Sequence, residues 1–232
     1  MLTNELINHG PGCNPFGVST SSSGKKIPGG TGDEIDYDWA EGLFEGYTSG
    51  QLENSAKLKM FLLLLDETIK SGERMLLFSQ SLLTLNLIEE FLQKRRIPNS
   101  DSTWIPGAHY YRLDGSTPAM ERERLINSFN AAAPQNWKSS SLQSPTSEVR
   151  CIPMLFLIST RAGSLGINLT GASRVVIFDA SWNPCHDSQA VCRIYRYGQT
   201  QRCHIYRLVT DGSLERKIYD RQINKQGMSN RI

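Results

Sequence analysis

The sequence predicts an α/β fold in which helices alternate with the strands of a mostly parallel sheet. Short apolar runs of strand length recur along the chain, at 75–79, 154–159 and 174–179. Longer stretches with helical periodicity separate these runs, and such alternation is typical of βαβ units. The chain has 232 residues, of which 39% are hydrophobic, and this is enough for one substantial core.

The first half of the pattern contains two helices and two strands. "AKLKMFLLLLDETIKSG" predicts a helix that Gly72 closes, because glycine adopts the left-handed conformation that follows many helices. The apolar run at 75–79 predicts a buried strand, and "LLTLNLIEEFLQKR" predicts an amphipathic helix after it. A second strand is predicted over 109–113.

The second half continues the alternation. Thr117 and Pro118 mark a helix start, because threonine is a favourable N-cap and proline fits the first helical position. The remaining predicted elements are strands over 154–159 and 174–179, a helix over 187–196, a strand over 203–209 and a last helix from 213 to Gly227.

Two segments do not follow this pattern. Residues 1–50 are rich in glycine, serine and proline, so we expect a flexible linker or tail, with order beginning near Gln51. Residues 131–150 predict a surface insertion without structure of its own. The folded part is therefore expected over 51–232.

Composition excludes some classes of protein and suggests a partner. The densest apolar run, "MFLLLL", is too short for a membrane span, and the N-terminus lacks the features of a secretory signal. The five cysteines contain no C-x-x-C pair, which indicates free thiols in a reducing, intracellular setting. Residues 1–56 carry two lysines against eight acids, whereas residues 189–232 carry nine Lys and Arg against three acids. This asymmetry suggests a polyanion partner for the C-terminal part, although a solvated basic face explains it equally well.

Four motifs each follow a predicted strand: "FSQ", "LDGST", "STRAGSLGINL" and "DASWNP". The carboxyl ends of parallel strands meet at one edge of a sheet, where ligands bind. Hydroxyls, the backbone N–H of Gly115 and the guanidinium of Arg161 could line a phosphate-binding edge there. Each motif alone is better explained as a turn that needs serine, glycine or aspartate, but four at matching positions favour a ligand edge.

The stretch "SQAVCRIYRYGQTQR" carries two arginines three residues apart. On a helix Arg193 and Arg196 would share one face, with Gln189 one turn before Arg193. Two permanently charged guanidinium groups can clamp a triphosphate and stabilise charge on a γ-phosphoryl group. The alternative is a pair of arginines held in internal salt bridges.

The chain lacks the other parts of a nucleotide-hydrolysing site. It contains no G-x-x-x-x-G-K-S/T phosphate loop and no strand-borne Asp-Glu pair for Mg²⁺, so on its own we expect it not to hydrolyse ATP. The adjacent pairs Cys185-His186 and Cys203-His204 are poorly arranged to ligate one tetrahedral ion, and no metal site is predicted.

Taken together, "MLLFSQS", "YYRLDGST", "LISTRAGSLGINL", "VVIFDASWNP" and "QAVCRIYRYGQ" resemble helicase motifs IV, IVa, V, Vb and VI. The match is to the second RecA-like lobe of Swi/Snf-type DNA translocases in helicase superfamily two, and within them to the ATRX branch. It covers roughly residues 51–232. The resemblance implies a RecA-like parallel sheet with helices on both faces, and a brace-like helix over 213–229.

The resemblance also implies roles for individual residues. Arg193 and Arg196 match the motif VI arginines that reach across a cleft to ATP, with Mg²⁺, on the first lobe. The other positions that match the ATP cleft are Gly163, Gly166, Asn168, Gln189, Gly198 and Gln199. The positions that match the DNA-facing surface are Ser79, Gln80, Gly115, Ser116, Thr160, Arg161, Trp182 and Asn183.

The resemblance implies an ATP-dependent motor that moves on double-stranded DNA, reads the backbone without sequence preference, and remodels chromatin in the nucleus. Its partners would be the N-terminal RecA-like lobe of the same motor, duplex DNA and nuclear transcription regulators. Two alternatives remain. One is an RNA helicase lobe, against which "RIYRYGQ" and "DASWNP" argue, and the other is a non-catalytic protein-interaction module.

Overall fold

The computed structural model describes residues 50–98, 100–131, 152–163 and 166–229. The expected tail over 1–50 and the expected insertion over 131–150 fall outside these ranges, apart from one terminal residue of each. The chain divides into two units between Ser55 and Ala56. In the first unit, a single 3₁₀ turn η2, Leu52–Asn54, is described. The rest of this subsection concerns the second unit.

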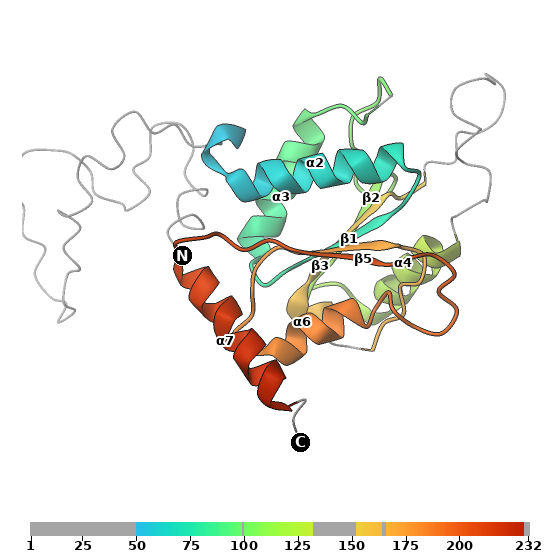
Figure 1. Cartoon of the computed structure of the whole chain (residues 1–232). Coiled ribbons are helices and arrows are strands. Elements are labelled where there is room, and N and C mark those ends of the chain that lie inside the picture. Colours follow the sequence, from blue (N-terminus) through green and yellow to red (C-terminus); the bar gives the residue numbers. More distant parts are fainter. Residues whose placement is uncertain (1–49, 99, 132–151, 164–165, 230–232) are drawn as a thin grey trace, which may run out of the picture. The chain divides into compact units, whose positions relative to one another are not determined.

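The second unit is built on a parallel sheet of five strands (Figure 1). The spatial order is β2-β3-β1-β4-β5, and because all pairings are parallel, every connection between consecutive strands is a crossover. The strands are β1 (Met75–Ser79), β2 (Tyr110–Leu113), β3 (Leu155–Ser159), β4 (Arg174–Ile177) and β5 (His204–Arg207). All pairings are parallel, which confirms the predicted α/β class and the RecA-like sheet.

The central strands are buried on both sides. All five residues of β1 and of β3 are buried, which explains why the two strands appear in the sequence as continuous apolar runs. On one face, Leu76 and Phe78 belong to a core cluster with Leu125, Phe129 and Ala190 from the helices of that side. Side chains alternate along a strand, so the intervening residues point to the opposite face.

Helices cover the two faces (Figure 1). The helices α2 (Ala56–Lys70) and α3 (Leu82–Lys94) lie on one side, and α4 (Ala119–Ala131) and α6 (Pro184–Val191) lie on the other. Gly72, with φ of 68°, follows α2 as predicted. Ser81 caps α3, because its hydroxyl accepts a hydrogen bond from the Thr84 N–H at 3.2 Å. Among the described residues no helix is long and apolar enough to cross a membrane.

The predicted helix over 187–196 is wrong at both ends. The helix α6 starts at Pro184, where the Asn183 side chain accepts from the Cys185 N–H at 3.1 Å, and it ends at Val191. After Val191 the Arg193 N–H donates to the Ala190 carbonyl and the Ile194 N–H to the Val191 carbonyl, three residues back instead of four, and residues 192–198 form turns and bends. The Arg193 carbonyl accepts from the Leu169 N–H at 3.0 Å.

The last helix, α7 (Leu214–Ser229), agrees closely with the predicted one and passes through Gly227. It packs against α6 near the C-terminal end of the unit. Most of its side chains are exposed or half-buried, whereas Gln222 is buried with 2% of its surface accessible. This helix is therefore held by a few polar contacts rather than by a broad apolar face.

Candidate functional site at the carboxyl edge of the sheet

The predicted site residues follow strand ends that lie side by side. Ser79 at the end of β1 pairs with Ser159 at the end of β3. The last residue of β2, Leu113, pairs with Ile158 of β3, and the last residue of β4, Ile177, pairs with Phe78 of β1. Both strands therefore end one residue short of the Ser79–Ser159 pair. The loops after the four strands therefore leave the sheet at the same edge, as the parallel arrangement predicted.

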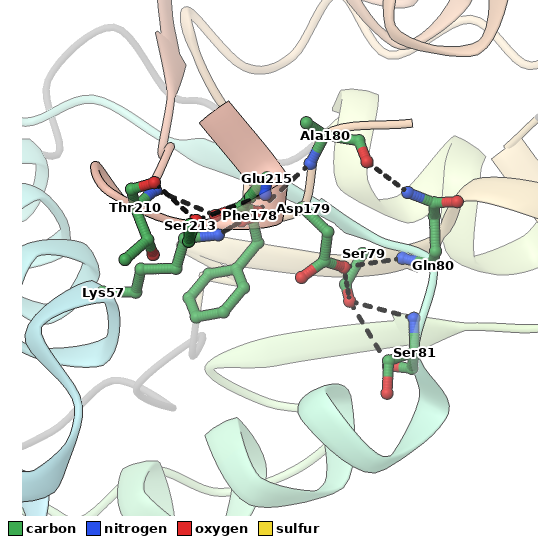
Figure 2. A network of polar contacts seen from close by, with 10 residues as sticks. All are labelled: Lys57, Ser79, Gln80, Ser81, Phe178, Asp179, Ala180, Thr210, Ser213 and Glu215. Carbon is green, nitrogen blue, oxygen red and sulfur yellow. Dashed lines mark hydrogen bonds and ion pairs between the residues drawn. The ribbon is translucent and has the colours of Figure 1, made fainter. Parts of the chain in front are cut away.

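The end of β1 is tied to the end of β4 (Figure 2). The Ser79 hydroxyl and the Gln80 N–H both donate to the Asp179 carboxylate, the second at 2.9 Å. The Gln80 side-chain amide donates to the Ala180 carbonyl at 3.1 Å. Ser79 is 1% exposed, so its hydroxyl acts within the unit, whereas Gln80 is exposed. These contacts fix the backbone from which the Trp-Asn segment begins.

The loop after β2 is ordered by the buried carboxylate of Asp114. This carboxylate accepts from the Ser116 N–H at 3.0 Å, the Ser116 hydroxyl at 2.6 Å and the Arg112 Nε at 3.0 Å. The pKa of the Asp114 carboxyl lies below its ordinary value, chiefly because of the Ser116 hydroxyl. A Cβ at Gly115 would meet no atom within 4 Å, and its φ is not positive, so nothing within this unit requires glycine there. A ligand that approaches the backbone closely would explain it.

The loop after β3 begins with one helical turn, α5 (Thr160–Gly163). Thr160 is half-buried, and Arg161 at the edge is exposed. Further on, Gly166 has φ of 53° and therefore needs glycine for backbone reasons. Gly163, predicted at the ATP cleft, is the last residue of α5. Along the chain it follows the DNA-facing candidates Thr160 and Arg161 and precedes Gly166.

The arginine turn joins this glycine turn. Arg196 is exposed, and its guanidinium donates to the Gly166 carbonyl at 3.4 Å and to the Cys192 carbonyl at 3.0 Å. Arg193 is only 5% exposed, and its carbonyl accepts from the Leu169 N–H. The two arginines therefore meet the segment that contains Gly166, although they lie on turns rather than on one helical face.

Two other predicted cleft residues, Gln199 and Asn168, lie on the segments that form this junction. The Gln199 side chain donates to the Thr170 carbonyl at 3.2 Å and to the Ala172 carbonyl at 2.8 Å, which closes the arginine turn on the glycine segment. Asn168 is exposed and its carbonyl accepts from the Asn130 side chain at 2.8 Å. Gln189 on α6 and Gly198, with φ of 93°, are both exposed.

The two guanidinium groups of the turn repel each other. The pKa of Arg193 lies below its ordinary value because of burial, with repulsion from the Arg196 charge as the second cause. A bound anion would relieve both effects, because it would neutralise charge in a partly desolvated place. Among the described residues, no group of three His, Cys, Asp or Glu side chains is placed to hold a metal ion.

Trp182 and Asn183 lie in the segment between β4 and α6. The Trp182 side chain is 56% exposed, and the Arg221 guanidinium lies 5.9 Å from the centre of its ring. Asn183 is exposed, and its side-chain oxygen caps α6. The exposure of Trp182 is compatible with the DNA-facing position implied by the resemblance, while the cap appears only once the start of α6 is known.

Sequence reasoning missed the ion pair between Lys57 on α2 and Glu215 on α7 (Figure 2). Both side chains are 19% exposed. The Lys57 ammonium also donates to the Phe178 carbonyl at 2.7 Å, and the Glu215 carboxylate accepts from the Thr210 N–H at 2.9 Å. The two residues are 158 positions apart, so no local pattern could have revealed the pair.

Comparison of the sequence with known proteins finds related helicases and transcriptional regulators. Helicase ARIP4 of Homo sapiens is 52% identical over 237 residues, which cover 99% of this chain and 14% of the relative. The transcriptional regulator ATRX of Mus musculus is 40% identical over 206 residues, covering 84% of this chain and 8% of the relative. The chain thus spans a small fraction of these relatives.

A solved structure shares the fold. The C-terminal part of the Fun30 ATPase domain is 34% identical, with a TM-score of 0.55 over 72% of this chain and 44% of that one. The identities confirm the resemblance to the ATRX branch of the Swi/Snf-type proteins. A family model described as the helicase conserved C-terminal domain matches residues 56–198. The chain therefore belongs to the helicase conserved C-terminal domain family.

Proposed function

We propose that this chain is the second motor lobe of an ATP-dependent translocase that moves on double-stranded DNA and remodels chromatin in the nucleus. It would contribute arginine fingers and contacts to the DNA backbone. The first RecA-like lobe of the same motor would supply the phosphate loop, and without it the chain is expected to be inactive towards ATP. Nuclear transcription regulators are the other partners proposed.

One observation carries the proposal: the exposed guanidinium of Arg196 is anchored at the Gly166 carbonyl, beside the buried Arg193. An arginine held at a rim by its Nε and one terminal nitrogen keeps donors available for a phosphate. Internal ion pairing of Arg196 would have argued against the motor, but its hydrogen bonds go to backbone carbonyls.

The donor set fits the phosphates of ATP. Arg193, Arg196 and the turn at Gly166 would meet them, while the first lobe would hold most of the nucleotide and Mg²⁺. When bound, ATP supplies the phosphoryl group whose transfer drives the motor. The role of this chain is to place two positive charges next to that group, where they stabilise the charge that develops as the phosphoryl group passes to water.

The DNA contacts are supported by exposure at the sheet edge. The exposed candidates are Gln80, Gly115, Ser116, Arg161, Trp182 and Asn183. Backbone N–H groups, hydroxyls and a guanidinium bind phosphates without reading sequence, so binding would be sequence-independent and would fall steeply with salt. Ser79 and Ser116 would act indirectly, because their hydroxyls donate to Asp179 and Asp114.

The test joins this chain in one polypeptide to the nucleotide-binding lobe of an ARIP4 relative and measures ATP turnover. We expect stimulation by duplex DNA. Arg196→Ala should lower the stimulated rate roughly a thousandfold, as expected for an arginine finger, while nucleotide affinity changes little. Arg202→Ala is the matched control, because Arg202 is an exposed arginine outside the junction with Gly166.

Three outcomes would contradict the proposal. Stimulation by single-stranded or duplex RNA but not by DNA would favour an RNA helicase lobe. No turnover by a folded fusion that binds ATP would favour an interaction module. Unchanged turnover in Arg196→Ala would exclude its role at the phosphoryl group.

A further inference from the structure

The helix α7 contacts three consecutive residues of the loop after β4. The Glu215 carboxylate accepts from the Ala180 N–H at 3.4 Å, and the Gln222 amide donates to the Ser181 carbonyl. The Arg221 guanidinium lies over the ring of Trp182. Glu215 and Gln222 are seven residues apart, about two helical turns, so they share one face of α7.

Gln222 contacts two further parts of the unit. Its Nε2 donates to the Ser181 carbonyl in the loop and to the Asp187 carboxylate of α6 at 3.0 Å. The side-chain amide has two N–H donors, and both are used here. Ser181 and Asp187 are 2% and 3% exposed, so water cannot readily replace these hydrogen bonds. One amide thus connects α7, the loop after β4 and the first turn of α6.

Trp182 needs such support, because its ring has little cover of its own. The side chain is 56% exposed, so packing does not hold it. Its backbone is fixed on one side by Ser181, through Gln222, and on the other by Asn183, which caps α6. If the hydrogen bond at Ser181 were lost, the segment would lose its anchor directly before Trp182, and on that side the contacts of Ala180 with Glu215 and Gln80 would remain one residue further away.

We propose that Gln222 is a positioning residue that sets the orientation of Trp182 towards DNA and couples it to α6. The inference rests on the proposed function, in which Trp182 faces DNA. The coupling matters because α6 leads into the turn that carries Arg193 and Arg196. The C-terminal helix thereby links the DNA-facing and the ATP-facing segments of the lobe.

The experiment uses the 232-residue chain labelled with 5-fluorotryptophan. The chain has four tryptophans, and each gives one fluorine resonance. Trp182→Phe assigns the signal of Trp182, and the buried Trp104, 2% exposed, serves as an internal reference for folding. The test variant is Gln222→Glu, which replaces the donor by a carboxylate that faces two acceptors. Gln226→Glu adds the same charge one turn later, where the amide reaches only the Ser188 hydroxyl at 3.5 Å.

In Gln222→Glu we expect the Trp182 resonance to shift or broaden while the Trp104 resonance stays in place. Affinity for duplex DNA should fall roughly threefold to tenfold, with the salt dependence unchanged because the phosphate contacts remain. Gln226→Glu should move neither signal and should leave the affinity within about twofold. Adding Asp187→Asn to Gln222→Glu restores a donor between α6 and α7 and should recover part of the shift.

If the Gln222→Glu variant does not fold, the Gln222→Met variant takes its place in the test, because it removes both N–H donors without adding a charge. An unmoved Trp182 resonance in a folded variant overturns the inference. Equal shifts of Trp182 and Trp104 also overturn it, because they indicate a merely structural role. If the wild-type chain binds no duplex DNA, the proposed function fails, whereas the fluorine comparison still decides whether Gln222 positions Trp182.

Discussion

Replacing Lys57 by methionine should destabilise the fold, because the ammonium group joins three elements. It pairs with the Glu215 carboxylate, donates to the Phe178 carbonyl, and lies 5.4 Å from the centre of the Phe178 ring. Methionine keeps most of the aliphatic length and removes the charge. Within the described part of the chain, the Glu215 carboxylate then retains the N–H groups of Thr210 and Ala180.

The magnitude follows from the burial of the pair. Removing one partner of a fully buried ion pair costs about 3–5 kcal/mol, whereas exposed pairs are worth about 0–1 kcal/mol. With both side chains 19% exposed, we expect a loss of about 2–3 kcal/mol in the free energy of unfolding. For a unit of this size, that corresponds to a fall in Tm of roughly 5–10 °C.

The effect should also depend on pH. Burial raises the pKa of the Glu215 carboxyl, but the hydrogen bonds from Lys57 and from backbone N–H groups outweigh burial, so the pKa lies below its ordinary value of 4.5. The stabilisation is therefore fully present above pH 4.5 and is lost as the pH falls through the folded-state pKa. The difference between wild type and Lys57→Met should shrink over the same window.

The assay is urea unfolding followed by circular dichroism, in a double-mutant cycle of Lys57→Met and Glu215→Gln. We expect a coupling energy of about 1–2 kcal/mol. Lys59→Met is the matched control on the exposed side of α2 and should change stability by less than about 0.5 kcal/mol. A loss in Lys57→Met no larger than in this control, or a coupling near zero, would refute the reasoning.

Two further predictions concern single residues. Arg161→Ala should weaken binding to duplex DNA of any sequence and lower the slope of log affinity against log salt by about one; an unchanged slope in fluorescence anisotropy would exclude the phosphate contact. Burial raises the pKa of the Asp187 carboxyl, so the folded protein binds this proton more tightly than the unfolded chain does. Protonation therefore stabilises the folded protein, and this stabilisation is lost as the pH rises through the folded-state pKa. In urea unfolding, wild type should therefore gain stability relative to Asp187→Asn as the pH falls from 7, and a constant difference would contradict this.

The sequence by itself determined the alternation of helices and strands. The strand β1 agrees with its prediction at both ends, and the other strands agree within two residues, because buried parallel strands are continuous apolar runs that local pattern reveals. It also determined that the site candidates would meet, since loops after parallel strands share one edge. The shared motifs then indicated the family before any fold was known.

Only the tertiary structure shows that α6 ends at Val191, because the turn that follows contacts a distant segment, where the Leu169 N–H donates to the Arg193 carbonyl. It alone decided that Gln222 would be buried in a helix whose other described side chains are exposed or half-buried, and that Lys57 would meet Glu215. These are contacts between residues far apart in the chain. Helix propensity and periodicity describe neighbours along the sequence, so they carry no information about such partners.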